Sequence, residues 1–324
     1  MKTRLKLLIR NHPFLFRIFR FVYSLIKKTV NLQHNVSYGN LNSDKTIYLI
    51  RPNTDDGIQG LMSLMAQVMR RIDYAVNKGY IPYIDFKTYK TQYYDGINNI
   101  WEVYFGQPSS LSFEEVYNSN RLIVSGVSLK CNENMELFQE KVFTNKHVAD
   151  RCFNLITRYV HYSAEIVEMV EDENKKIDIS NCIGVYVRGT DYVKLKPVGE
   201  YVQPKIDDVL IKTKEFLSKY NSNVFLVTED EHVYNKFRES FGNELRIVSF
   251  DSFIKDYDGK SFLSKSNVLQ ENKYMRGRDY LIKIILLSQC RYLVTSKTMG
   301  SIMAYSMNGG KYEDQFIFEL GIYK

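Results

Sequence analysis

The sequence lacks the short motifs that mark the commonest metal and nucleotide sites. Its four cysteines, Cys131, Cys152, Cys182 and Cys290, are widely scattered and form neither a CxxC pair nor a Cys/His metal spacing. Neither GxGxxG nor the P-loop pattern GxxxxGK followed by Ser or Thr occurs. No histidine or cysteine stands in an arrangement that indicates a nucleophile. We therefore expect buried free thiols in a reducing compartment, and no metal site.

The N-terminal region also lacks an uninterrupted apolar run. Residues 13–28 read PFLFRIFRFVYSLIKK, and Arg17 and Arg20 make this stretch too charged to span a bilayer. It has no small-residue cleavage site, so a signal peptide is not expected. Basic and apolar residues instead recur at helical spacing on two separate faces. This pattern predicts an amphipathic helix on an anionic membrane surface; the alternative is a helix packed on the protein's own body.

Acidic residues are missing from this same region. The net charge is +7, and residues 1–28 hold eight Lys and Arg and no acid. Residues 29–324 therefore carry +7 − 8 = −1. A nucleic-acid-binding surface needs its cations on the fold itself, so we expect no nucleic-acid partner.

The rest of the chain alternates between strand-like and helical segments, which predicts parallel α/β sheets. The expected strands are 46–50, 81–86, 121–126, 182–188, 223–228, 245–250 and 291–295. The expected helices are 61–78, 147–173, 205–220, 231–241, 279–289 and 300–307. We interpret residues 1–44 as a basic amphipathic segment and linker, 45–175 as an acceptor-side domain and 176–324 as a nucleotide-sugar-binding domain. The two domains are expected to be Rossmann-like, to face a cleft and to be joined by a solvated hinge near 171–176.

Ligands of open α/β sheets bind at the carboxyl ends of the strands. The apolar run 182–187 ends at Arg188, whose planar, permanent cation suits phosphate oxygens. Gly189 would allow close backbone approach, and Asp191 could orient the arginine or bind a sugar hydroxyl. The alternative is a structural Arg–Asp pair at a turn.

The next strand ends in the acidic run Thr228-Glu229-Asp230-Glu231. A carboxylate here can accept two parallel N–H bonds from the edge of guanine, which adenine cannot offer. The alternatives are an acidic helix N-terminus that complements the macrodipole, or a DxD-like metal site, whose spacing the run does not match.

The last expected strand leads into SKTMGS (296–301) and a helix. The hydroxyls of Ser296, Thr298 and Ser301 cluster there with backbone N–H groups, which is typical of an anion site. The alternative is an ordinary N-cap. One arginine, one acidic pair and one hydroxyl-rich helix start at three strand ends together indicate an anion-bearing nucleotide.

These residues resemble the fucosyltransferase superfamily, which includes the α1,2-, α1,6- and protein O-fucosyltransferases. The similar stretches are VRGTDY (187–192), FLVTED (225–230) and LSQCRYLVTSKTMGS (287–301). The runs 189–204 and 309–323 are similar to bacterial members of capsule and lipopolysaccharide biosynthesis. The resemblance implies a GT-B fold, a GDP-sugar donor such as GDP-fucose, inversion at the anomeric carbon and no required metal or other cofactor.

The resemblance also implies roles for single residues. It assigns Arg188 to the donor diphosphate, Asp230 or Glu229 to guanine, and Thr298 with the 296–301 backbone to phosphate. Arg278 aligns with an arginine that precedes the family's apolar helix.

Four positions depart from the family pattern. The motif's arginine pair is Arg-Gly, and Lys283 replaces an acid inside the helix. Lys194 to Lys196 stand where the α1,6 enzymes carry a catalytic acid. Glu200 stands where bacterial relatives often have His.

The residues and this resemblance together predict an inverting, GDP-sugar-dependent glycosyltransferase that transfers fucose from GDP-fucose, with Glu200 and Asp191 as candidate bases. Its expected acceptor is a glycan or lipid-linked glycan of surface polysaccharide, and its expected location is cytoplasmic, peripheral at the inner face of the cell membrane through residues 13–28. Three rival functions stay open: a transferase using another nucleotide sugar, a non-catalytic nucleotide-sugar- or glycan-binding protein, and a membrane scaffold.

Overall fold

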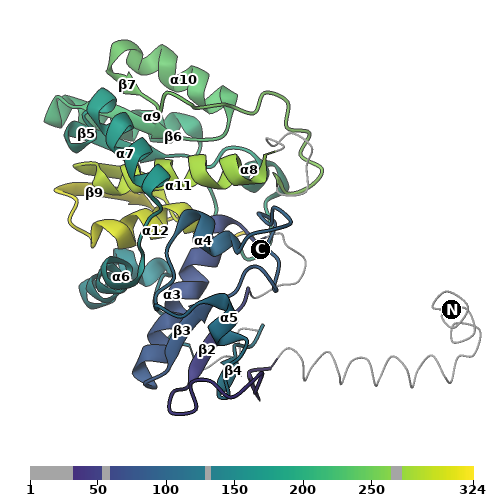
Figure 1. The fold of residues 1–324 in the computed structure, drawn as a ribbon. Helices are drawn as coiled ribbons and strands as arrows, with labels where there is room; N and C mark the ends of the chain where they lie inside the picture. Colours follow the sequence, from purple (N-terminus) through teal and green to yellow (C-terminus); the bar gives the residue numbers. More distant parts are fainter. Residues whose placement is uncertain (1–31, 53–58, 128–132, 264–271) are drawn as a thin grey trace, which may run out of the picture.

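The computed structural model describes residues 32–52, 59–127, 133–263 and 272–324 (Figure 1). The amphipathic segment predicted at 13–28 lies outside these residues, as does Cys131. Cys152, Cys182 and Cys290 are buried free thiols, as expected.

The first sheet has four strands in the order β1-β4-β2-β3. They are β1 (His34–Val36), β2 (Ile47–Ile50), β3 (Ile81–Ile84) and β4 (Leu122–Val124). β2 runs parallel to both of its neighbours, and β1 pairs antiparallel at the edge. β1 was expected to be linker, because three half-exposed residues carry too little apolar pattern to indicate a strand.

The second sheet has five strands, all parallel, in the order β7-β6-β5-β8-β9. They are β5 (Cys182–Tyr186), β6 (Asn223–Val227), β7 (Leu245–Arg246), β8 (Tyr292–Ser296) and β9 (Asp314–Phe318). The central strand β5 is buried throughout, which its continuous apolar run requires. β7 is shorter than predicted, and β9 was not predicted because each of its residues is half-exposed at the sheet edge.

Ten described helices surround these sheets. They are α3 (Leu61–Asn77), α4 (Ile100–Tyr104), α5 (Phe113–Val116), α6 (Lys146–Tyr159), α7 (Ala164–Ile177), α8 (Asp191–Leu195), α9 (Ile206–Tyr220), α10 (Glu231–Phe241), α11 (Lys273–Gln289) and α12 (Met299–Asn308).

Two helix predictions were wrong. The single helix expected at 147–173 is broken at 160–163 into α6 and α7, and the hinge expected at 171–176 lies inside α7. α11 starts at Lys273 instead of 279, since the Asn272 side chain caps it by accepting from the Met275 amide at 3.1 Å.

The largest hydrophobic core is shared by the two sheets. It joins Ile50 of β2, Met65 of α3, Phe225 of β6, Leu286 of α11 and Met303 of α12. Figure 1 shows the second sheet above the first, with α6 and α12 between them. The α/β architecture with parallel sheets is therefore confirmed. A division into two domains that face a cleft stays a prediction, because the core runs continuously between the sheets.

Among the described helices, none combines the length and the apolar character that a membrane crossing requires.

Gly184 lies where α11 packs on β5. A Cβ atom there would lie 2.7 Å from Leu287 Cδ1 and 2.9 Å from Cys290 Sγ. Gly184→Ala therefore overpacks the core, and we expect it to lower the free energy of unfolding in urea by about 1–3 kcal/mol. Gly60→Ala is the matched control, since its added Cβ meets nothing within 4 Å. Equal stability of the two variants would contradict this packing.

Candidate functional site

Three predicted strand ends meet at one edge of the second sheet. β5 lies between β6 and β8, and all three are parallel. Tyr186 of β5 is opposite Val227 of β6 and Thr295 of β8. The residues that follow these strands therefore lie side by side, which brings together the predicted groups around Arg188, Glu229 and Ser296.

Arg188 is held by two carboxylates. Its Nε and Nη2 donate to Asp191 Oδ1 at 3.2 and 2.8 Å, and its Nε lies 3.5 Å from Glu229 Oε1. The side chain is 22% exposed, and its guanidinium lies 5.2 Å from the centre of the Tyr192 ring. Burial acts to lower the pKa of Arg188, but the two acids and Tyr186 raise it above its ordinary value.

The carboxylate of Asp191 holds Arg188 in place. It is buried, its Oδ1 accepts from Arg188, and its Oδ2 accepts the backbone N–H of Leu263 at 3.1 Å. Both oxygens are engaged, so the predicted orienting role is the one that this geometry supports. The Arg–Asp pair offered as an alternative is therefore present in the structure.

Glu229 and Asp230 have different surroundings. Glu229 Oε1 accepts from the Thr190 hydroxyl at 2.7 Å, in addition to facing Arg188. Asp230 is the N-cap of α10, and its Oδ1 accepts from the His232 amide at 2.8 Å. A Cβ atom at Gly189 would lie 2.6 Å from Asp230 Oδ2. Gly189 thus makes room for a neighbouring side chain of the same sheet edge.

The start of α12 satisfies its own hydroxyls. Thr298 and Ser301 form a capping box, and Ser301 Oγ also donates to the Ser296 carbonyl at 2.6 Å. Ser296 Oγ donates to Gln203 Oε1 at 2.6 Å. The ordinary N-cap is therefore present too. It leaves the amides of Met299 and Gly300 in the first helical turn as the donors that an anion would meet.

Glu200 lies beside this site on an exposed turn. Its backbone carbonyl accepts from Tyr323 N at 2.8 Å, and Val202 N donates to Gly321 O at 3.0 Å. The last residues of the chain thereby hold the segment. Burial and the Glu200 carboxylate raise the pKa of Tyr192, whose ring covers Arg188. Glu200 is the predicted base that keeps an exposed carboxylate.

Arg278 lies away from the other predicted residues. Its Nη1 donates to Glu165 of α7 at 3.0 Å and its Nε donates to Asp279 at 2.9 Å. The nearby Arg276 faces a different side of α11: its Nη2 donates to Gln92 at 3.2 Å. The sequence analysis did not single out Arg276. Positions two apart on a helix point to nearly opposite sides, so the spacing alone indicates that Arg276 and Arg278 face different surroundings.

Lys283 is paired in a buried position with Asp251, from the segment after β7. Burial raises the pKa of Asp251, although Lys283 acts against this. The chain therefore places a carboxylate beside Lys283, in the apolar helix α11. Within the described ranges, no group of three or more His, Cys, Asp or Glu could hold a metal ion.

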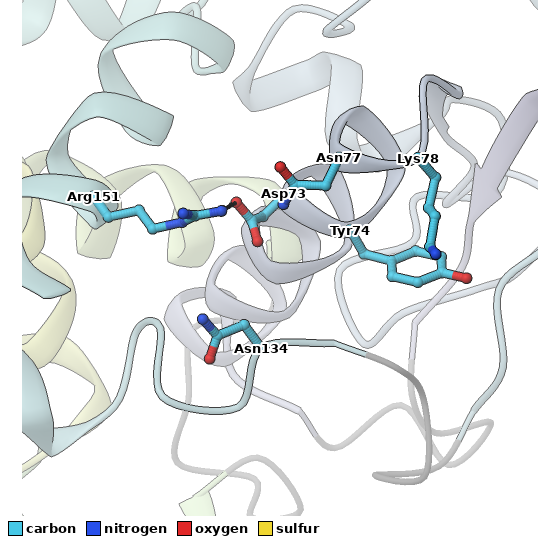
Figure 2. A pocket seen from close by; sticks show the side chains of 6 residues that line it. All are labelled: Asp73, Tyr74, Asn77, Lys78, Asn134 and Arg151. Carbon is cyan, nitrogen blue, oxygen red and sulfur yellow. Dashed lines mark hydrogen bonds and ion pairs between the residues drawn. The ribbon is translucent and has the colours of Figure 1, made fainter.

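A separate pocket of about 390 Å³ lies at the C-terminal end of α3 (Figure 2). It is lined by Asp73, Tyr74, Asn77, Lys78, Asn134 and Arg151. Arg151 Nη2 donates to Asp73 Oδ1 at 2.7 Å across it. α3 ends just before β3 begins, so this pocket lies near the amino ends of the parallel strands β2 and β3, at the opposite end of the first sheet from their carboxyl ends. None of the predicted site residues lines it.

No protein-family model matches the chain, and no curated protein does. Among solved structures, it is similar to NodZ alpha-1,6-fucosyltransferase soaked with GDP-fucose, at 17% identity and a TM-score of 0.48, over 81% of this chain and 93% of that one. It is also similar to an Arabidopsis thaliana FUT1 mutant in complex with GDP, at 11% identity and a TM-score of 0.45, over 86% and 72% of the chains. POFUT1 in complex with GDP matches at 9% identity and a TM-score of 0.47, over 85% and 98%.

The roles of Asp191 and Glu200 can be distinguished by how much a substitution at each position changes the free energy of unfolding. Asp191→Asn removes the buried charge that faces Arg188 and places an amide against the Leu263 N–H, so we expect it to lower the free energy of unfolding by about 2–3 kcal/mol. Glu200→Gln changes an exposed side chain, and we expect a shift within about 0.5 kcal/mol. Urea denaturation at pH 7 measures both. An unchanged free energy of unfolding in Asp191→Asn would contradict the role of Asp191 in orienting Arg188.

Proposed function

We propose that the protein is an inverting glycosyltransferase that moves a sugar, fucose, from GDP-fucose to a glycan acceptor. The convergence of Arg188, Glu229 with Asp230, and the α12 start at one sheet edge carries this proposal. These are the stretches that resemble the fucosyltransferase superfamily. Their convergence supports one nucleotide-sugar site and argues against three unrelated structural motifs.

The donor diphosphate would bind at Arg188 and the first turn of α12. The guanidinium offers paired N–H groups to phosphate oxygens. The Met299 and Gly300 amides add partial positive charge at the helix start. Both would stabilise the charge that develops on the departing diphosphate, without a metal ion.

The reaction would be a single displacement. The acceptor hydroxyl oxygen bonds to the anomeric carbon as the bond from that carbon to the diphosphate oxygen breaks, which inverts the configuration. The hydroxyl proton passes to a carboxylate. Glu200 suits this step because it is exposed beside Tyr192, whereas both oxygens of Asp191 are bonded.

The acceptor would approach from the first half of the chain, including 53–60, and would be a glycan or lipid-linked glycan of surface polysaccharide. Residues 13–28 would hold the protein on the anionic inner face of the cell membrane.

The second candidate function is a glycosyltransferase whose donor carries a nucleobase other than guanine. Asp230 caps α10, and Glu229 is shared by Thr190 and Arg188. Each carboxylate predicted to select guanine therefore already has protein donors. This favours testing uridine nucleotides beside guanosine nucleotides.

Calorimetric titration of the full chain with GDP, GDP-fucose, UDP and ADP tests the donor. We expect binding of guanine nucleotides only, and a roughly 10- to 100-fold loss of GDP affinity in Arg188→Lys, which keeps the charge beside the two acids but loses the planar fork. Thermal unfolding checks that the variant is folded. UDP-only binding would move the protein to another donor, and binding of no nucleotide would refute the transferase.

Glu200→Gln tests the base. We expect its turnover with GDP-fucose to fall about 100- to 10,000-fold while GDP affinity stays within about threefold, since the carboxylate contacts the acceptor proton and not the donor. Release of GDP in the presence of a glycan acceptor measures turnover. Retained turnover would exclude Glu200 as the catalytic base, and another carboxylate would then have to accept the proton.

A further inference from the structure

Arg276 is a cation with neutral partners. Its Nη2 donates to Gln92 Oε1 at 3.2 Å, and its guanidinium lies 5.5 Å from the centre of the Tyr93 ring. In the described part of the chain no carboxylate forms an ion pair with it, whereas Arg278 on the same helix has two. Its charge is therefore available to an anion without the loss of an existing ion pair.

The side of α11 that carries Arg276 leads to the candidate site. Tyr280 lies one turn further on, and its hydroxyl is 3.1 Å from the hydroxyl of Tyr186, which ends β5 two residues before Arg188. A Cβ atom at Gly300 would lie 2.6 Å from Tyr280 Oη and 2.8 Å from Tyr186 Cε1. The first turn of α12 thus packs closely against the Tyr186–Tyr280 pair, whose members stand two residues before Arg188 and four residues after Arg276.

Arg188 and Arg276 also share a neighbour. Burial raises the pKa of the Tyr93 hydroxyl, and both arginines act to lower it. Tyr93 accepts the backbone N–H of Leu61 at 3.1 Å, at the start of α3. The Arg276 guanidinium therefore lies on a ring that also contacts the start of α3, at the junction between the two halves of the chain.

The charge around Arg188 alone does not favour a diphosphate. Arg188, Asp191 and Glu229 sum to +1 − 1 − 1 = −1. A diphosphate carries negative charge on each phosphate, so it would meet the repulsion of two acids beside one arginine. A second cation near the α12 start, added to the partial charge of the helix amides, would make the local field positive.

We propose that Arg276 is a donor-binding residue that contacts the outer phosphate in the diphosphate of the nucleotide sugar. This inference rests on the proposed function and adds to it the group that offsets the acids around Arg188. Arg276 would move from Gln92 onto a phosphate oxygen, exchanging a neutral acceptor for a charged one.

Titration calorimetry of the full chain with GDP, UDP and GMP tests this inference. We expect Arg276→Gln to weaken GDP binding about 10- to 100-fold and GMP binding less than about threefold, because the lost contact is to the outer phosphate. Arg276→Lys restores part of the affinity. Arg291→Gln is the matched control with unchanged binding, since that arginine pairs with Glu313 at 2.7 Å before β8, at the other end of the sheet.

Several outcomes would overturn the inference while the proposed function stands. These are unchanged GDP binding in Arg276→Gln, equal loss of GDP and GMP, or a loss in Arg278→Gln alone. The Arg276→Lys variant decides the matter if Arg276→Gln does not fold. If the wild type binds UDP instead of GDP, the prediction of a guanine nucleotide fails. The affinities of the wild type and of Arg276→Gln for UDP then decide the role of Arg276. A wild-type protein that binds none of the three refutes both proposals.

Discussion

The buried charge of Arg188 is the constraint on which the arrangement of the site depends. A permanently charged group that is mostly removed from water needs acceptors, and Asp191 and Glu229 supply them. Asp191 also binds the Leu263 amide, and Glu229 binds the Thr190 hydroxyl. Satisfying one guanidinium therefore orders the turn after β5, the turn after β6 and the segment at Leu263 together.

α11 connects this cluster to the first half of the chain. Its apolar residues pack on β5, β6 and α12, and its first turns contact the segment before α4. Tyr104 of α4 donates its hydroxyl to the Tyr274 carbonyl at 3.0 Å, and a Cβ atom at Gly277 would lie 2.2 Å from that hydroxyl oxygen. Close packing at Gly277 fixes the direction of the neighbouring Arg276. The helix that covers the second sheet thereby also places a cation at the junction.

Much of the second sheet could be predicted from the sequence, because a parallel central strand is buried on both faces and reads as a continuous apolar run. That run also located Arg188 at a strand end, and the parallel order brought Glu229 and Ser296 beside it. The edge strands β1 and β9 were missed, since half-exposed residues give no such run. The break between α6 and α7 was missed because 160–163 (Val-His-Tyr-Ser) holds no Gly or Pro to mark a helix end, although Ser163 is a typical N-cap residue and stands at the N-cap of α7.

The candidate site was predictable in its membership and not in its charge balance. Motifs identify Arg188, Asp191 and Glu229, but whether the acids neutralise the arginine depends on distances that only the fold provides. The ligand-binding and structural interpretations of these residues turn out to be compatible, since each side chain already has a protein partner. An incoming anion must then compete with two carboxylates for Arg188, whereas Arg276 is held by an amide oxygen and an aromatic ring. If the proposed site binds a diphosphate, its affinity would therefore depend most on Arg276, the cation whose present partners are neutral and which carries no motif of its own.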